Sequence, residues 1–347
     1  MKTTAVSLPR LTLPSSSGLT ARLGDFVTLM KPRVMLLAVF TALVGLLIAP
    51  RHLDPLHAAI AIMAIAAGGG AAGVLNMWHE SDIDAAMTRT AKRPIPRGKI
   101  SRAEALLFGT ALAGGAVATL GFALNVVAAA LLAFAIVFYV VVYTMWLKRR
   151  TPQNIVIGGA AGALPPVIGW AAATGSVGLE SLVLFLIIFL WTPPHFWALA
   201  LNRSDEYARA GIPMLPVVAG RAATTRQILI YSALLVPATV LPWVLGFAGP
   251  TYAAAVVVCG TIFIGFTVQL RLSRATDTRP AQRVFAFSIF YLFVLFAALL
   301  TGGSIDRAQT LSAPGAWANR ELAQSKLPSR LGHATRPSSS LVKTDGV

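Results

Sequence analysis

Nine stretches of this 347-residue chain contain no lysine, arginine, aspartate or glutamate, and each is 17 to 22 residues long. As a helix, each stretch is long enough to cross a hydrocarbon layer of about 30 Å. Only helices and closed barrels satisfy their own backbone hydrogen bonds in lipid. The sequence therefore predicts an all-α integral membrane protein with nine transmembrane helices. The stretches are residues 34–50, 56–77, 105–123, 125–146, 153–174, 181–201, 227–247, 251–270 and 284–301.

Composition excludes a water-soluble globular domain, because 56% of the residues are hydrophobic and only 12% are charged, against about a quarter charged in soluble domains. The net charge of +16 could indicate a nucleic-acid ligand. The positions of the 29 basic residues indicate topology instead: 22 lie before, between or after spans on one side, and only Arg51 lies in a loop on the other side. This asymmetry predicts a cytoplasmic N-terminus and an external C-terminus, with no nucleic acid bound.

We expect three parts in the chain: a flexible tail over residues 1–24, an intramembrane domain over 25–301, and a disordered tail over 302–347. The last segment is rich in Ser, Arg and Ala and has no clear periodicity, which is typical of disorder. Residues 1–24 are basic, Ser-rich and free of acids, which leaves a short organelle-targeting peptide open. A bacterial inner membrane is the simpler location.

Two cytoplasmic segments contain five of the thirteen acidic residues. In the first motif, Asn76, Glu80 and Asp84 are spaced i, i+4, i+8, so they share one face if the helix continues to this point. In the second motif, Asn202 and Glu206 repeat the Asn-x-x-x-Glu spacing, with Asp205 beside them. Four spans separate the two motifs, and because four is even, both are expected on the same side of the membrane.

This arrangement favours a diphosphate site. Mg²⁺ prefers oxygen ligands and typically takes one or two carboxylates together with phosphate oxygens, and arginine makes bidentate contacts to phosphate. Two such motifs could hold a diphosphate between metals and offset the charge of the leaving group of an allylic diphosphate, while the apolar bundle houses the lipid tail. The basic residues beside the first motif are Arg89, Lys92, Arg93, Arg97 and Lys99. The alternative is that these charges form solvated ion pairs of little consequence.

Six stretches of the sequence resemble the UbiA superfamily of intramembrane prenyltransferases, and in particular its branch that farnesylates heme. The resemblance extends from about residue 25 to residue 301 and implies a UbiA-type bundle with its active site on the cytoplasmic side. The stretches are residues 76–84, 87–94, 143–149, 154–159, 191–197 and 205–216.

The resemblance also implies roles for individual residues. Asn76, Glu80 and Asp84 would stand at the first diphosphate motif, and Arg89 and Arg93 would contact the diphosphate or the heme carboxylates. Asn202, Asp205 and Glu206 would form the second diphosphate motif. Glu80 stands where the family usually has aspartate, and Asn202 replaces the first acid of the second motif, which makes metal ligation there less regular. The metal ligands would be Glu80, Asp84, Asp205 and Glu206, all binding Mg²⁺.

His195 lies inside the sixth stretch, in the run Trp191-Thr-Pro-Pro-His-Phe-Trp197. Ionisable residues inside membrane spans are usually functional, and histidine is a common ligand of heme iron. The alternative is that His195 donates a hydrogen bond to a carbonyl group freed by Pro193 or Pro194. We favour heme binding.

By this resemblance, the function is the transfer of a farnesyl group from farnesyl diphosphate to a vinyl group of protoheme IX (heme b), giving heme O, with membrane lipid and a heme A synthase as further partners. Two alternatives stay open: a prenyltransferase acting on an aromatic or quinone precursor, and a secondary transporter, which would also suit a broken helix. The clustering of the acids at one face of the membrane favours the enzyme.

Overall fold

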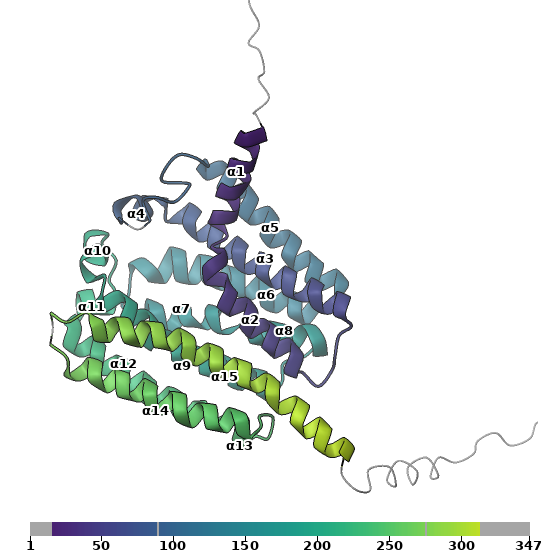
Figure 1. Ribbon diagram of the computed structural model, residues 1–347. Coiled ribbons are helices and arrows are strands. Elements are labelled where there is room, and N and C mark those ends of the chain that lie inside the picture. Colours follow the sequence, from purple (N-terminus) through teal and green to yellow (C-terminus); the bar gives the residue numbers. More distant parts are fainter. Residues whose placement is uncertain (1–15, 89, 275, 313–347) are drawn as a thin grey trace, which may run out of the picture. The chain divides into compact units, whose positions relative to one another are not determined.

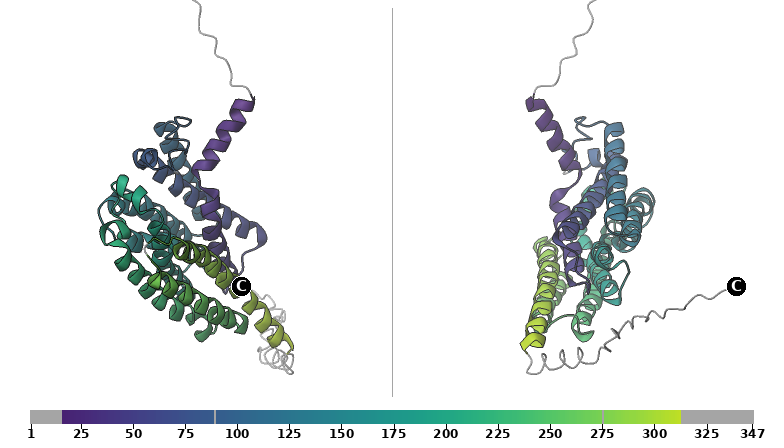
Figure 2. Two further views of the ribbon diagram at one scale, coloured as in Figure 1. Left: turned by 60° about the vertical axis from the view of Figure 1, so that its left-hand side comes forward. Right: turned by 90° about the vertical axis from the view of Figure 1, so that its right-hand side faces the viewer.

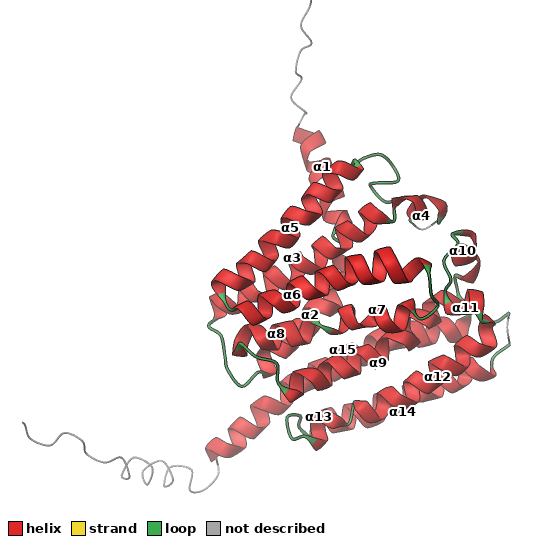
Figure 3. Ribbon diagram, turned by 180° about the vertical axis from the view of Figure 1, so that it is seen from behind, coloured by secondary structure: helices red, strands yellow, loops and turns green. Residues whose placement is uncertain are grey.

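A computed structural model describes residues 16–88, 90–274 and 276–312 (Figure 1), and every regular element among them is a helix (Figure 3). The all-α prediction is therefore confirmed. The helices are α1 (Ser16–Leu29), α2 (Pro32–Ile48), α3 (Pro55–His79), α4 (Ser81–Ala86), α5 (Arg102–Ala123), α6 (Val126–Val137), the π-helix η1 (Phe138–Trp146), the 3₁₀-helix η2 (Leu147–Arg149), α7 (Asn154–Ala163), α8 (Pro165–Thr174), α9 (Leu179–Leu201), α10 (Ser204–Arg209), α11 (Leu215–Val218), α12 (Gly220–Ala238), α13 (Leu241–Val244), α14 (Pro250–Leu272) and α15 (Arg279–Ser312).

The helices account for the nine predicted spans. Eight helical stretches in the described part of the chain are long and apolar enough to cross a membrane. The remaining predicted span corresponds to α2, which forms a bent pair with the end of α1: residues 21–29 and 32–48 meet at 54°. Counted as one span, this pair brings the total to nine.

Both ends of the helical region extend beyond the predicted boundaries. Helix α1 begins at Ser16, inside the segment expected to be a flexible tail. It is held by an ion pair between Arg22 and Glu104 and by an edge-to-face contact of Phe26 with Phe108. Helix α15 continues to Ser312. By its contacts the chain divides into one unit over residues 1–303 and another over 304–347; residues 1–15 and 313–347 lie outside the described residues.

Side-chain caps fix where three of the helices begin. Asp54 accepts hydrogen bonds from the backbone N–H groups of Leu56 and His57 at the start of α3, and Ser101 and Glu104 form a capping box at the start of α5. Asn125 caps α6 through the N–H of Ala128, and its amide also donates to the carbonyls of Ala171 and Ala172 at the end of α8. Caps therefore define the helix ends and also join neighbouring helices.

The spans differ in how much protein surrounds them. In the most apolar 18 residues of the α7–α8 stretch, 72% is buried. In the most apolar 18 residues of α5, 22% is buried. On α5, Phe122 is 94% exposed and Leu107 is 72% exposed. Large apolar side chains remain on an outer surface without cost where that surface faces lipid. Helices α7 and α8 are thus central, and α5 is peripheral.

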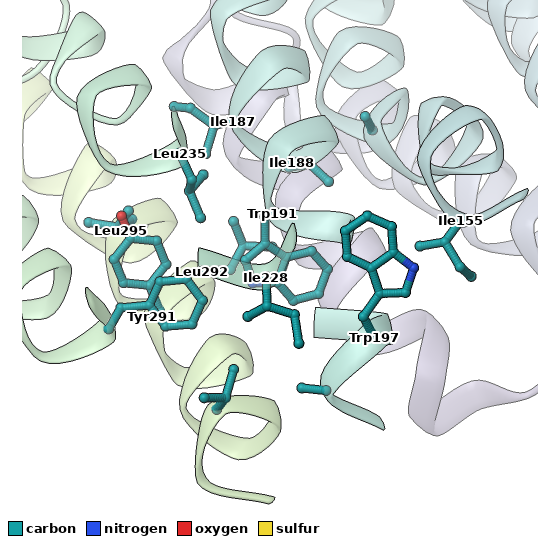
Figure 4. Close-up of a cluster of buried hydrophobic side chains, with 14 of the residues drawn as sticks. Ile155, Ile187, Ile188, Trp191, Trp197, Ile228, Leu235, Tyr291, Leu292 and Leu295 are labelled. Atoms are coloured by element: carbon teal, nitrogen blue, oxygen red, sulfur yellow. The ribbon is translucent and has the colours of Figure 1, made fainter. Parts of the chain in front are cut away.

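A large apolar cluster joins α9 to α12 and α15 (Figure 4). Trp191 and Trp197 of α9 lie in it together with Ile228 and Leu235 of α12 and Tyr291 of α15. Trp197, Ile228, Leu235 and Tyr291 are each at most 1% exposed. This cluster holds α9 in place. Helix α9 contains His195 and ends immediately before the second motif.

Helices α4 and α10, which follow the two long helices α3 and α9, lie at the same end of the bundle (Figures 1 and 3), and the two further views in Figure 2 are consistent with this. Both short helices have six residues and follow their long helix after a break of one or two residues. Both motifs therefore lie at one end of the bundle (Figures 1 and 3), as the even number of spans between them predicts.

Helices α2 and α8 pack so closely that glycine is required at the contact. A methyl group on Gly169 would overlap the carbonyl oxygen of Ala42, and one on Gly45 would overlap the carbonyl of Pro166. Backbone atoms cannot move aside as the end of a flexible side chain can, so the two helices would have to separate.

We predict that Gly169→Ala lowers the free energy of unfolding by about 1–3 kcal/mol or more, the usual cost of overpacking a core. Gly114→Ala is the matched control, because nothing lies within 4 Å of the methyl group it adds on α5. Unfolding of both variants in detergent, followed by tryptophan fluorescence, tests this. Equal stabilities would contradict the close α2–α8 contact.

Candidate active site

The first motif keeps its residues on one side although the helix does not continue through it. Helix α3 ends at His79 and α4 begins at Ser81. The backbone N–H of Glu80 donates to the carbonyl of Asn76, and that of Asp84 donates to the carbonyl of Glu80. These i→i−4 bonds bridge the break, so Asn76, Glu80 and Asp84 are all buried, at 2–3% exposed.

Each of these three side chains contacts a lysine or an arginine. Lys31 Nζ donates to Asn76 Oδ1 at 2.7 Å, and Lys148 Nζ donates to Glu80 Oε2 at 2.6 Å. Arg93 donates from one guanidinium nitrogen to both oxygens of Asp84, at 2.7 and 2.6 Å. Buried carboxylates require such partners, because an unpaired charge away from water is costly.

Lys31 lies at the break between α1 and α2. It is the only residue other than glycine with a positive φ in the described part of the chain, at φ 54°, a conformation that costs a non-glycine residue roughly 1 kcal/mol or more. Pro32 follows it and begins α2. The left-handed turn directs the start of α2 so that the Lys31 side chain reaches Asn76, 45 residues away in the sequence.

The two carboxylates of the first motif differ in how their basic partners hold them. Both oxygens of Asp84 are hydrogen-bonded to Arg93. Lys148 Nζ lies 2.6 Å from both oxygens of Glu80 but makes its hydrogen bond to Oε2, so Oε1 is held by the ion pair without a hydrogen bond. A further ligand of Glu80 would share Oε1 with Lys148 or displace it.

The π-helix η1 closes this side of the site. Asn76 Nδ2 donates to the hydroxyl of Thr144 at 3.1 Å, and that hydroxyl donates to the carbonyl of Tyr139 at 2.8 Å. Tyr143 lies against Gly158, where a methyl group would overlap the phenol ring. Short π-helical segments are frequent at functional sites, and this one joins the first motif to α7 through Asn76–Thr144 and Tyr143–Gly158.

The second motif is more open than the first. Asn202 caps the end of α9, and its amide donates back to the carbonyl of Ala198 at 3.4 Å. Asp205 is exposed. Glu206 lies 3.6 Å from Arg203, and its Oε2 is enclosed without a hydrogen-bond partner among the described residues. The repeated Asn-x-x-x-Glu spacing therefore does not give equivalent positions, because Asn76 lies inside its helix and Asn202 lies at the end.

An exposed ion pair lies next to the buried ones. Arg149 donates to both oxygens of Asp82, at 2.9 and 3.0 Å, and the two side chains are 40% and 57% exposed. Partial burial raises the pKa of Asp82, but hydrogen bonds from the N–H of Ile83 and from Arg149 outweigh it, so this pKa lies below its ordinary value. The expectation of solvated ion pairs thus fits Asp82, and it does not fit Glu80 or Asp84.

The remaining predicted basic residues are less closely placed. Arg89 lies outside the described residues. Lys92 and Arg97 are exposed, and Lys99 pairs with Asp25 of α1 at 3.0 Å. Of the basic residues predicted beside the first motif, the structure brings Arg93 into contact with it.

The oxygen ligands at this end of the bundle suit Mg²⁺. Each motif contributes an enclosed carboxylate oxygen without a hydrogen bond: Glu80 Oε1, which Lys148 contacts as an ion pair, and Glu206 Oε2. Mg²⁺ is usually held by one or two carboxylates with substrate phosphates and water. Within the described ranges, no three His, Cys, Asp or Glu side chains lie together as a metal site. Glu80 and Asp84 would each have to exchange a basic partner for a metal, and Asp205 is exposed, so of the four predicted ligands Glu206 has the most available oxygen.

His195 is buried between α9 and α15 and is 8% exposed. Its Nδ1 lies 2.7 Å from the hydroxyl of Ser288, and its ring stacks on Trp191 and on Phe285 with centroids 4.3 and 4.7 Å apart. The expected alternative, a bond to a carbonyl freed by Pro193 or Pro194, is not among the hydrogen bonds of the described residues. A serine hydroxyl takes that place.

Sequence reasoning missed Lys31 and Lys148 as members of the site. Lys148 lies in the stretch 143–149 that carries the family resemblance, and Lys31 precedes a proline at the edge of the first span. Both positions can be seen in the sequence, but a lysine beside a span ordinarily indicates only which side of the membrane that end faces. Only the contacts identify these two as partners of Asn76 and Glu80.

Sequence comparisons relate the chain to prenyltransferases. The profile of the UbiA prenyltransferase family matches residues 38–294. Protoheme IX farnesyltransferase 2 of Mesorhizobium japonicum is 60% identical over 291 residues, which cover 83% of this chain and 92% of that protein. Protoheme IX farnesyltransferase of Afipia carboxidovorans is 62% identical over 281 residues, covering 80% and 90%.

Solved structures share the fold at low sequence identity. A structure concerning digeranylgeranylglyceryl phosphate synthase matches with a TM-score of 0.68 at 20% identity, covering 81% of this chain and 98% of that one. A UbiA homolog from Archaeoglobus fulgidus, bound to GPP and Mg²⁺, matches with a TM-score of 0.56 at 18% identity, covering 79% and 99%. At these identities the likeness concerns the fold alone.

The buried pair of Lys148 and Glu80 generates a stability prediction. Their side chains are 16% and 3% exposed, so Lys148→Met leaves a buried carboxylate unpaired and should lower the free energy of unfolding by about 3–5 kcal/mol. The double variant Glu80→Gln/Lys148→Met should recover most of this loss. Arg149→Met is the control, because an exposed pair contributes about 0–1 kcal/mol. Denaturant titrations in detergent test this, and equal losses in Lys148→Met and Arg149→Met would contradict it.

Proposed function

The chain belongs to the UbiA prenyltransferase family, and we propose that it transfers a farnesyl group from farnesyl diphosphate to a vinyl group of protoheme IX, giving heme O. The observation that carries this proposal is the identity of about 60% to proteins named protoheme IX farnesyltransferase, over nine-tenths of their length. The same likeness favours heme over an aromatic or quinone precursor as the acceptor. Family membership also favours an enzyme over a transporter.

The diphosphate binds at the end of the bundle that holds both motifs. Lys148 supplies positive charge there, and Lys31 supplies N–H donors. Arg93 uses one guanidinium nitrogen for Asp84, and its other N–H groups, which have no partner among the described residues, are available to phosphate oxygens. These cations stabilise the negative charge that develops as the bond between farnesyl C1 and the diphosphate oxygen breaks. Arg89 is proposed as a further contact.

Glu80 and Glu206 would hold Mg²⁺ through the oxygens that make no hydrogen bond, with Asp84 and Asp205 as further ligands. At Glu80 the metal would take over from the Lys148 ammonium, and bound Mg²⁺ would add charge neutralisation at the leaving diphosphate. Asn76 and Asn202 line the two motifs and orient their neighbours. Asn76 does so through its bonds to Lys31 and Thr144.

Protoheme IX binds deeper in the bilayer, beside His195. Asn202 follows His195 by seven positions, a rise of roughly 10 Å along a helix. An apolar macrocycle is stable at that depth, and a diphosphate is not. The terminal vinyl carbon forms the new bond to farnesyl C1, a water oxygen adds to the remaining carbocation, and the water proton is released. A heme A synthase is the expected partner that takes up the product.

The charge distribution supports a bacterial inner membrane location with the N-terminus and the active site in the cytoplasm. Fusions after Thr301 test this: an alkaline phosphatase placed there should be active, and a fluorescent reporter that folds only in the cytoplasm should be dark. The opposite pattern would contradict the nine-span topology.

We predict that Glu80→Gln and Asp84→Asn each abolish heme O formation, since each removes a charged group from the diphosphate end. Glu80→Asp should retain substantial activity because it keeps the carboxylate. Asp82→Asn is the matched control, because Asp82 lies two residues from Glu80 and two from Asp84. Its carboxylate is exposed and paired with Arg149, so its removal should leave the activity unchanged. Heme mass after incubation with heme b, Mg²⁺ and farnesyl diphosphate is the measurement.

Chelation of divalent cations should stop the same reaction, and added Mg²⁺ should restore it. Wild-type rates of heme O formation in Glu80→Gln and Asp84→Asn would contradict a role of these acids in the reaction. They would then serve only as structural partners of Lys148 and Arg93. Full activity in chelator would contradict the metal requirement.

His195→Ala should separate the two substrates. We expect this variant to bind farnesyl diphosphate with Mg²⁺ as the wild type does, but to lose the heme Soret shift and heme O formation. His57→Ala is the control, because His57 is exposed and pairs with Asp54 at the start of α3. An unchanged Soret band with an unchanged yield of heme O would move the heme site elsewhere.

A further inference from the structure

Ser288 of α15 makes three hydrogen bonds at the same place. Its hydroxyl lies 2.7 Å from His195 Nδ1 and donates to the carbonyl of Phe285 at 2.7 Å. Its own carbonyl accepts the indole N–H of Trp191 at 2.7 Å. Both Trp191 and His195 belong to α9 and flank Pro193 and Pro194. One serine therefore joins α15 to the interrupted part of α9.

The contacts of the Ser288 hydroxyl favour one tautomer of His195. A hydroxyl has a single proton to donate, and the carbonyl of Phe285, 2.7 Å away, can only accept it. When the hydroxyl donates there, it accepts from His195 Nδ1, and this arrangement requires a proton on Nδ1. In a neutral imidazole the lone pair is then on Nε2.

The surrounding rings prevent His195 from exchanging its two nitrogens by rotation. Trp191 stacks on one side with an interplanar angle of 17°, and Phe285 stacks with an angle of 25°. Phe196 meets the ring edge-on, with centroids 5.0 Å apart. Nε2 has no hydrogen-bond partner within the described ranges and is not one of the fully enclosed unpartnered atoms. Nε2 is therefore the ring nitrogen that remains for a further ligand.

Other buried serines do not share this arrangement. Ser232 of α12 is also fully buried and donates to the carbonyl of Ile228 at 2.8 Å, and Ser181 donates to that of Gly178 at 2.8 Å. In the described part of the chain, neither hydroxyl makes a second hydrogen bond. Such bonds to the preceding turn satisfy a buried hydroxyl on their own, so the contact with His195 requires a separate explanation.

We propose that Ser288 is a positioning residue that holds His195 with Nδ1 protonated and presents the Nε2 lone pair to the iron of protoheme IX. This inference rests on the proposed function. Histidines that bind metals usually donate their other ring N–H to a fixed acceptor, which sets the tautomer and the ring orientation. Ser288 is that acceptor here. The sequence gives no signal for it, because 93 residues separate the two side chains.

The test uses the full-length protein labelled with ¹⁵N at histidine, of which the chain has five. The spectrum of His195→Ala identifies the His195 signals by difference. In the wild type we expect a protonated Nδ1 and an unprotonated Nε2, and added heme b should shift the Nε2 signal. A protonated Nε2 in the wild type would overturn the proposal without any further variant.

Substitutions of Ser288 provide the second arm. Ser288→Ala should lose the single tautomer and weaken heme binding by about 10- to 100-fold, the usual effect of removing the partner of a metal-binding histidine. Ser288→Thr keeps the hydroxyl and should restore both. Ser232→Ala is the matched control, since it removes a buried hydroxyl bonded to its own helix, and it should leave tautomer and heme affinity unchanged.

Turnover in the same preparations separates this inference from the proposed function. Heme O formation without any shift of the Nε2 signal on adding heme would leave the activity intact and overturn the role of Ser288. A shift of Nε2 without farnesylation would support the role of Ser288 and contradict the proposed reaction. An identical spectrum and heme affinity in Ser288→Ala and the wild type would also overturn the inference.

Discussion

The pairing of buried charge at one end of the bundle is the constraint on which the rest of the structure depends. Glu80 and Asp84 are almost completely buried next to apolar spans, and removing one partner of such a pair costs far more than the pair contributes. Lys148 and Arg93 therefore have to reach them. This requirement fixes η2 and the loop after α4 against the end of α3. Lys31 adds a third contact at Asn76 and fixes the bend between α1 and α2.

Irregular backbone lies beside proposed site residues at three places. The break between α3 and α4 lies at Glu80, the π-helix contains Tyr143 and Thr144, and the tandem proline of α9 lies beside His195. In lipid, polar groups at such irregular places need partners within the protein. Thr144 donates to the carbonyl of Tyr139 within η1 and accepts from Asn76 of α3, and Ser288 of α15 contacts Trp191 and His195 of α9. Polar contacts between helices therefore gather where the helices are irregular.

The two substrate sites proposed for this enzyme differ in their physical character. The diphosphate end combines lysine, arginine and carboxylate side chains near the ends of α3 and α9. The heme side is aromatic, with a single imidazole held between Trp191 and Phe285. Such a division keeps the charged leaving group near water and leaves the farnesyl chain and the macrocycle in the apolar bundle, where each is most stable.

The sequence by itself determined the membrane-spanning helices, their order and the common side of the two acidic motifs, because these follow from apolar stretches long enough to cross a bilayer and from counting spans. It also identified Glu80, Asp84 and His195 as unusual residues. It did not identify Lys31 or Lys148 as members of the site. It also did not reveal the ion pair between Arg93 and Asp84 or the contact of His195 with Ser288. Residue spacing specifies the face of a helix and the side of the membrane, but the partner across a helix interface depends on how helices far apart in the chain pack. Only the tertiary structure decided which charges are paired and which carboxylate oxygens remain free.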